Sequence, residues 1–285
     1  MNLQEIALDI RNVIKTKQEE LGLQFFEDDH KYLMKDVNGN IRDNFPSVSK
    51  ILKHFYTEFP TEEAALKKAG GDYIEAERLM GEWAQAGKDS TNMGSRVHFY
   101  LEKELISRNG SYKEVRQPVF ECDIFSESKS ENMIRAGHTY LDLCENRNLV
   151  LLDTEMVLGH PELGYTGQPD KVWITMNATG TEFGLLITDW KSNKEKNFQV
   201  NSYTKPMLSP FEEYPDNALG HYYLQLPFYG KLLIKMLEGT KYEGIKLLGC
   251  IVVLLKETQE YEEFRVPKPI IGTIMDMDMS LVLKN

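Results

Sequence analysis

Hydrophobic and polar residues alternate along the chain with two different periods, one typical of helices and the other of strands. Apolar residues at steps of three and four predict amphipathic helices over residues 2–22, 94–105 and 131–148. Short apolar runs predict strands over residues 149–158, 246–256 and 260–266. The run at 246–256 is almost continuously apolar, so we expect a central strand that is buried on both faces, with 260–266 as an outer strand.

Residues 165–191 read as two further strands joined by a polar turn. Asp170 stands before the first of these strands, and Asp189 stands near the end of the second. Because side chains alternate across a strand, Asp189 and Lys191 leave one face and Trp190 leaves the other. Two carboxylates on neighbouring strands suit Mg²⁺, which takes one or two protein carboxylates and completes its shell with water and phosphate oxygens.

The N-terminal pattern predicts a helix, a hairpin and a second, short helix. Gly22 is placed to end the first helix, and residues 23–48 form a hairpin pattern about the tight turn Asn38-Gly39. Ser47 is the expected N-cap of the helix that follows Pro46.

Other stretches carry weaker patterns. We expect helix over residues 61–92, broken at Gly70-Gly71 and at Gly87, and a polar, irregular surface segment over residues 107–130. The tail from Pro267 has no recognisable pattern.

A long polar segment, residues 192–216, separates Lys191 from a core helix predicted over 219–237. Pro227 within that helix predicts either a bend or a helix whose first turn begins nearer Pro227. Loops of this length are usually functional or mobile. The loop could close over a bound strand or be an ordinary solvated loop, and its lysines are Lys194, Lys196 and Lys205.

Composition is that of an ordinary globular protein. The chain has 285 residues, of which 41% are hydrophobic and 27% charged, and it has neither an apolar run of membrane-spanning length nor the core of a signal peptide. Three separated cysteines are too few for a four-cysteine cluster. We expect each of them to be a small, buried, apolar side chain. We therefore expect a soluble, cytoplasmic protein. The net charge of −11 argues against non-specific binding of nucleic acid, although the local field matters more than the total.

Acidic, lysine, histidine and glutamine residues occur in a fixed order. In sequence these are Gly94-x-x-x-His98, Glu155, Gly167-Gln168-Pro169-Asp170, Asp189-x-Lys191 and Gln225-x-x-x-Tyr229. Asp29-x-Lys31 and Glu127-x-Lys129 match the acidic-x-Lys pattern too, but the Asp189 instance ends an apolar strand and follows an aspartate one hairpin upstream. This order resembles the PD-(D/E)XK nuclease superfamily, in its RecB-like, phage-type exonuclease branch. His30-x-Tyr32 and residues 45–49 resemble the N-terminal region of the same exonucleases.

The resemblance implies an α/β fold with a restriction-endonuclease-like core, in which helices flank a central mixed β-sheet. It also implies two parts, a helical N-terminal extension over residues 1–93 and a nuclease core over 94–285. The implied activity is Mg²⁺- or Mn²⁺-dependent hydrolysis of DNA, most simply by an exonuclease of DNA processing or recombination. DNA and a recombination or replication protein are the implied partners, and the cytoplasm is that of a bacterium or of a phage host.

The resemblance also assigns roles to single residues. His98, Asp170, Asp189 and the backbone carbonyl of Trp190 are the implied metal ligands, and Asp170, Asp189, Lys191 and Glu155 the implied catalytic set. Lys191 would orient water or stabilise charge, and Gln225, Tyr229 and Lys194 would contact the substrate. Glu102 is a candidate neighbour of the metal ligands.

Alternatives remain for individual residues and for the activity. His98 could be a structural histidine, and Glu155 an outward-facing charge at a sheet edge. A structure-specific endonuclease, or a non-catalytic nucleic-acid-binding or assembly module on the same scaffold, would carry the same pattern.

Overall fold

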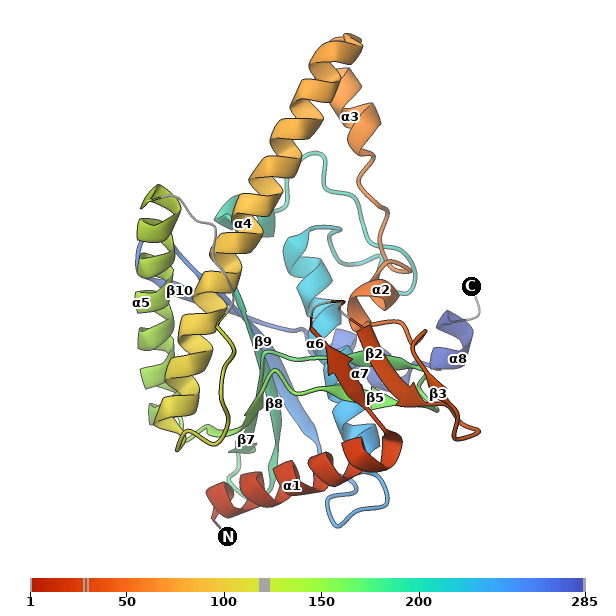
Figure 1. Cartoon of the computed structure of the whole chain (residues 1–285), viewed down its shortest axis with the longest axis vertical. Helices are drawn as coiled ribbons and strands as arrows, with labels where there is room; N and C mark the ends of the chain where they lie inside the picture. The colour runs from red at the N-terminus through yellow and green to blue at the C-terminus, as the bar shows by residue number, and fades with distance from the viewer. Residues whose placement is uncertain (1, 28, 30, 118–123, 284–285) are drawn as a thin grey trace.

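A five-stranded mixed β-sheet lies at the centre of the protein (Figure 1). The computed structural model describes residues 2–27, 29, 31–117 and 124–283. The strand order is β10-β9-β8-β7-β4, with β8 and β9 parallel and the other neighbours antiparallel. The strands are β4 (Val150–Thr154), β7 (Lys171–Met176), β8 (Phe183–Lys191), β9 (Leu247–Leu255) and β10 (Tyr261–Arg265).

Helices cover both faces of this sheet, each over its own hydrophobic core. One face packs on α1 (Leu3–Leu21), α6 (Ala218–Leu237) and α7 (Lys268–Asp276), and the other on α4 (Tyr73–Arg108) and α5 (Ile124–Asn146). Alternation along the strands divides the side chains, so that Val172 enters the first core and Trp173 the second. The predicted α/β class, with a mixed sheet between helices, is confirmed.

The buried strand predicted near the C-terminus is β9, whose last six residues are all buried. It pairs with β8 on one side and with β10 on the other, and β10 is the predicted outer strand. The middle position of the sheet nevertheless belongs to β8. The helix α6 makes the crossover between the parallel pair and contains Pro227, so the predicted helix is confirmed.

The N-terminal elements follow the predicted pattern. Gly22 ends α1 in the left-handed conformation (φ 58°), and Gly39 (φ 82°) turns the hairpin. Ser47 holds the N-cap position of α2 (Val48–Leu52) without a capping hydrogen bond from its side chain. His30 lies outside the described residues. The strands here are β1 (Gln24–Phe26), β2 (Lys31–Lys35) and β3 (Ile41–Arg42), while β5 (Leu158–His160) pairs with β6 (Tyr165–Gly167).

The helix α4 is longer than predicted and forms an arm with α3 (Thr61–Lys68), which projects from the body (Figure 1). Gly70 and Gly71, both with positive φ, break the pattern as expected. The predicted break at Gly87 is wrong, because α4 continues through it to Arg108. The predicted boundary between residues 93 and 94 falls inside α4, and the division into an extension and a core stays a prediction.

Three other expectations need correction. The helix α5 begins at Ile124, within the segment that we expected to be irregular. The strand expected over residues 149–158 ends at Thr154. The C-terminal tail forms α7 and α8 (Met279–Val282).

Two of the three cysteines lie within the described residues. Cys144 and Cys250 are buried, as expected, and Cys122 lies outside the described residues. Among the described helices, none combines the length and the apolar character that a membrane span requires.

Candidate metal centre

Strand pairing brings the two predicted aspartates to the same edge of the sheet. Lys171 opposes Thr188 across the antiparallel pair of β7 and β8, so Asp170 and Asp189 follow as the next opposed pair. The backbone N–H of Trp190 donates to Asp170 Oδ2 at 3.1 Å. The two side chains are therefore neighbours at this edge, and burial together with the Asp170 charge opposes the ionisation of Asp189.

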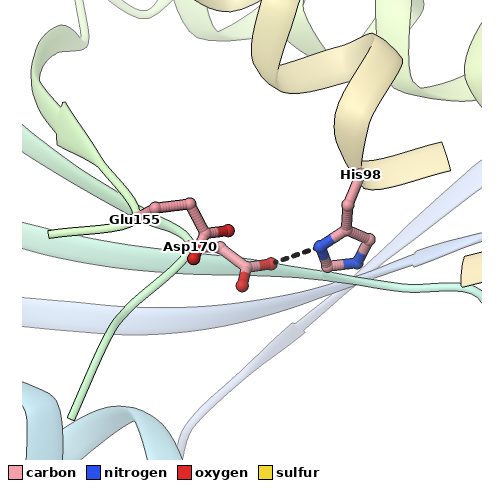
Figure 2. A group of neighbouring side chains, drawn as sticks. All are labelled: His98, Glu155 and Asp170. Carbon is pink, nitrogen blue, oxygen red and sulfur yellow. Dashed lines mark ion pairs between the residues drawn. The ribbon is translucent and has the colours of Figure 1, made fainter. Parts of the chain in front are cut away.

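His98, Glu155 and Asp170 converge beside this pair, from α4, from the residue after β4 and from the residue before β7. Their ligand atoms all lie within 4.8 Å of one another. Figure 2 shows the Asp170 carboxylate between Glu155 and the imidazole ring. His98 Nδ1 is 3.4 Å from Asp170 Oδ2. Two oxygen donors and one nitrogen donor thus surround one point.

Hydrogen bonding fixes which nitrogen of His98 faces the cluster. His98 Nε2 lies 3.0 Å from the carbonyl oxygen of Trp190, which can only accept, so Nε2 carries the hydrogen. Burial lowers the pKa of His98 despite the nearby Asp170 carboxylate, so the ring is neutral near pH 7 and Nδ1 presents a lone pair. The Trp190 carbonyl, an expected metal ligand, therefore binds His98, and its role as a ligand stays a prediction.

Asp189 is 2% exposed and lies next to Lys191, whose Nζ is 2.8 Å from Asp189 Oδ2. Burial, and then the adjacent Asp170 carboxylate, raises the pKa of Asp189 to about 8. Burial also opposes ionisation of Asp170, but at the low pH where this carboxyl titrates, His98 is protonated, and its charge and that of Lys171 hold the pKa of Asp170 well below the usual range. Within the described part of the chain, the buried Asp189 Oδ1 has no hydrogen-bond partner.

We expected Glu155 to lie on a strand. It lies instead just beyond the end of β4. Its backbone is left-handed (φ 42°), which is unusual for a residue with a side chain. Two hydrogen bonds hold it: its N–H donates to the Asp170 carbonyl at 3.0 Å, and its carbonyl accepts from Gln168 Nε2 at 3.0 Å. Burial, followed by the Asp170 charge, raises the pKa of Glu155 well above its ordinary value.

Two glycines of the motifs allow close packing at the site. A Cβ on Gly94 would lie 3.0 Å from Ser192 Oγ, so glycine lets α4 approach the residue after Lys191. A Cβ on Gly167 would lie 2.6 Å from Cε1 of the Tyr229 ring. A side chain at position 167 would therefore displace the Tyr229 ring, whereas one at position 94 would require only a small shift of the Ser192 hydroxyl.

The predicted substrate residues differ in exposure. Gln225 Nε2 donates to Tyr229 Oη at 2.8 Å, and Tyr229 is only 6% exposed. Lys194 is exposed. Glu102 accepts from Thr154 Oγ1 at 2.7 Å and lies 3.3 Å from Lys113 Nζ, so it is engaged in a neighbouring network.

Three residues at the site were missed. Lys171 is fully buried, with Nζ 3.5 Å from Asp170 Oδ2 and 3.2 Å from the centre of the Trp190 ring. The Tyr222 ring lies 4.3 Å from Lys191 Nζ. Gln168 was part of the quoted motif, but its bond to Glu155 has no sequence signal. A lysine at the start of an apolar strand was the one available signal for a buried cation.

A cavity of about 620 Å³ opens beside the cluster. Its lining includes Phe25, His98, Phe99, Lys113, Glu155 and Gln168. His98 and Glu155 therefore face a space large enough for a small ligand or for part of a polymer.

No protein-family model matches the chain, and no curated protein matches it.

Proposed function

We propose that the chain is a divalent-metal-dependent deoxyribonuclease of the PD-(D/E)XK type, with a restriction-endonuclease-like core. The observation that carries this proposal is the convergence of His98, Glu155 and Asp170 within 4.8 Å. Asp189 and Lys191, in contact at 2.8 Å on the next strand, supply the remaining groups of the motif. We propose an exonuclease that acts in DNA processing or recombination.

The donor groups fit a divalent cation. A neutral His98 turns the lone pair of Nδ1 toward a carboxylate oxygen at 3.4 Å, an arrangement that a shared cation would stabilise. The unpartnered, buried Asp189 Oδ1 offers a further oxygen at the same edge. His98, Glu155 and Asp170 would hold the ion, with Asp189 beside them. Carboxylates suit Mg²⁺, and an imidazole ligand also admits Mn²⁺.

A bound ion of this kind supplies an acidified water and neutralises charge on the phosphate oxygens. Lys191 then donates hydrogen bonds where negative charge develops. Burial lowers the pKa of Lys191, but the Asp189 and Asp170 carboxylates more than compensate and leave it above the ordinary value. Lys191 therefore stays an ammonium and acts as a charge stabiliser rather than as a base. His98 is held in one tautomer by the Trp190 carbonyl.

Replacement of Asp189 tests the proposal. Asp189→Asn keeps the shape of the side chain but removes a carboxylate, so metal-dependent cleavage of linear DNA should fall by at least about 100-fold. Asp142→Asn is the control, because Asp142 is an exposed aspartate of α5 that is not among the residues of the cluster. Cleavage by Asp189→Asn at the wild-type rate would remove the assignment.

Substrate form separates the activities in the same assay. Wild-type protein is mixed with linear or closed circular DNA in Mg²⁺, Mn²⁺ or EDTA. Cleavage of linear DNA alone supports an exonuclease, whereas nicking of the circle indicates an endonuclease. No cleavage of either with any ion would leave a non-catalytic module on this scaffold.

A further inference from the structure

The segment that follows Lys191 is basic in an otherwise acidic protein. Residues 192–205 contain three lysines and one glutamate, a net charge of +2, whereas residues 206–216 carry −3 and the whole chain −11. Lys194, Lys196 and Lys205 are all exposed. The glutamate forms an ion pair with a lysine outside the segment, so it does not neutralise these three. A local positive field therefore lies next to the candidate metal centre.

The start of this segment is fixed to α6. Tyr222 Oη donates to Asn193 Oδ1 at 2.9 Å, and Phe198 is buried in the core beside α6. Lys194, three residues after Lys191, lies within about 11 Å of it along the chain. Lys194 is thus held near the candidate metal centre by a fixed attachment.

The end of the segment displays an aromatic ring. Tyr203 is 88% exposed. A local turn supports it: the Tyr203 N–H donates to Asn201 Oδ1 at 2.9 Å, and the Asn201 N–H donates to Thr204 Oγ1 at 3.0 Å. An exposed ring among lysines is the composition of surfaces that bind single-stranded nucleic acid, where bases stack on the ring and cations follow the phosphates.

The α3–α4 arm provides an internal comparison. It exposes Tyr73 (78%) at its tip, much as the loop exposes Tyr203. Residues 58–89, however, carry eight acidic and four basic side chains, a net charge of −4. Phosphate is repelled by the net charge of the arm and attracted by that of residues 192–205, so charge favours this segment for the nucleic acid.

We propose that residues 192–205 bind a single strand of DNA, with a base stacked on Tyr203 and phosphates contacted by Lys194, Lys196 and Lys205. This inference rests on the proposed function, because it assumes a DNA substrate. A duplex keeps its bases stacked inside, so the ring has a partner only on an unpaired strand. The metal centre therefore receives single-stranded DNA, or an end that is opened into single strands.

The test is the affinity of the full chain for a fluorescent oligothymidylate, measured by fluorescence anisotropy in EDTA so that no cleavage occurs. Tyr203→Ala should weaken binding of this strand about 5- to 100-fold, and Tyr73→Ala should leave it unchanged. The double variant Lys196→Gln, Lys205→Gln should make the salt dependence shallower: the negative slope of log K against log salt should decrease in magnitude by about 1.4. Lys67→Gln with Lys68→Gln is the matched pair on the arm and should leave that slope unchanged.

Each result decides the proposal. Equal losses from Tyr203→Ala and Tyr73→Ala, or a loss from the loop lysines alone, would overturn the stacking site. A duplex of the same length that binds as tightly as the single strand would also overturn it. Because binding is measured without metal, the loop can fail while Asp189-dependent cleavage stands. Strand binding that depends on Tyr203 without any cleavage would reject the nuclease and keep the loop site.

Discussion

Glu155 shows how much of the site depends on a single backbone conformation. A left-handed residue with a side chain costs on the order of 1 kcal/mol or more, and such residues are concentrated at functional sites. Two hydrogen bonds, to the Asp170 carbonyl and from the Gln168 amide, hold the conformation. They place the Glu155 carboxylate beside Asp170 and His98 instead of at the sheet edge.

Loss of the Gln168 amide should therefore weaken metal binding without removing a ligand. Gln168→Met keeps the length of the side chain but cannot donate to the Glu155 carbonyl. We expect Mn²⁺ affinity, measured by calorimetry, to fall about 10-fold, which is typical when a group that orients a ligand is lost. Gln85→Met is the control, because Gln85 Nε2 also donates one hydrogen bond, to Asp89 Oδ1 on the exposed arm. Unchanged Mn²⁺ affinity in Gln168→Met would show that metal binding does not depend on the hydrogen bond that holds the Glu155 backbone.

Metal affinity should also depend on pH through Asp189. The pKa of this carboxyl is raised to about 8, so below pH 8 it holds a proton that a cation must displace. Apparent Mn²⁺ affinity should rise about 10-fold per pH unit from pH 6 to 8 and level off above pH 8. Calorimetry in buffers of different ionisation enthalpy should detect about one proton released at pH 7. An affinity that does not change over this range would contradict the presence of a proton on Asp189 below pH 8.

Tyr222 should position Lys191 through its ring rather than through its hydroxyl. The ring centre lies 4.3 Å from Lys191 Nζ, within the range of a cation–π contact. Tyr222→Leu should lower kcat for DNA cleavage about 10-fold with little change in KM, whereas Tyr222→Phe, which keeps the ring, should retain most of kcat. Equal losses in both variants would assign the effect to the Asn193 hydrogen bond instead.

Among the elements, α4 departs most from the predicted pattern. Gly87 stands in an exposed stretch of helix, where glycine costs about 1 kcal/mol relative to alanine but does not break the helix. Gly70 and Gly71 do break the pattern, because their positive φ angles are incompatible with an α-helix. Glycine by itself did not distinguish these two cases.

Alanine at Gly81 and Gly87 should accordingly stabilise the protein. A Cβ at either position meets nothing within 4 Å, and both residues are helical. The double variant should raise the free energy of unfolding by about 1–2 kcal/mol in urea denaturation. Gly167→Ala, whose Cβ meets the Tyr229 ring, is the opposite case and should lower it. Destabilisation by the Gly81 and Gly87 changes would show that α4 is not continuous there.

The predictable parts of the fold and the site have a common physical basis. Buried apolar periodicity marked α1, α6, β8 and β9, and alternation placed Asp189 and Lys191 on one face. The contacts of Lys171 and Gln168 depend on segments that are distant in sequence, so no local pattern could reveal them. The periodicity predicted α5 only from residue 131, because the helix begins in a polar stretch at Ile124, and the short α7 produced no clear period. The motif order placed His98 near the aspartates through a resemblance, whereas the tautomer of His98 needed coordinates.

At the scale of the whole molecule, the candidate centre joins segments that share no local structure. One ligand comes from the helical layer on one face of the sheet, and the others come from strand ends. A cation bound there would tie α4 to β4 and β7 and would stabilise only the folded chain.

Mn²⁺ should therefore raise the melting temperature. At 100 times the dissociation constant, binding contributes about 2.7 kcal/mol, which corresponds to a shift of roughly 5 °C for a protein of this size. Scanning fluorimetry with and without Mn²⁺ measures the shift. His98→Ala should abolish it, and His138→Ala, a histidine outside the cluster, should preserve it. A shift of the same size in both variants would indicate binding elsewhere.

The unbroken course of α4 has a mechanical consequence. Tyr73 at the tip of the arm and His98 at the metal centre belong to one helix and are about 38 Å apart along its axis. The helical segment between them acts as a rigid rod, with the candidate metal ligand His98 near one end. A small tilt of the ligand as a cation binds is enlarged at the distant end, where a spectroscopic label would register it without touching the chemistry.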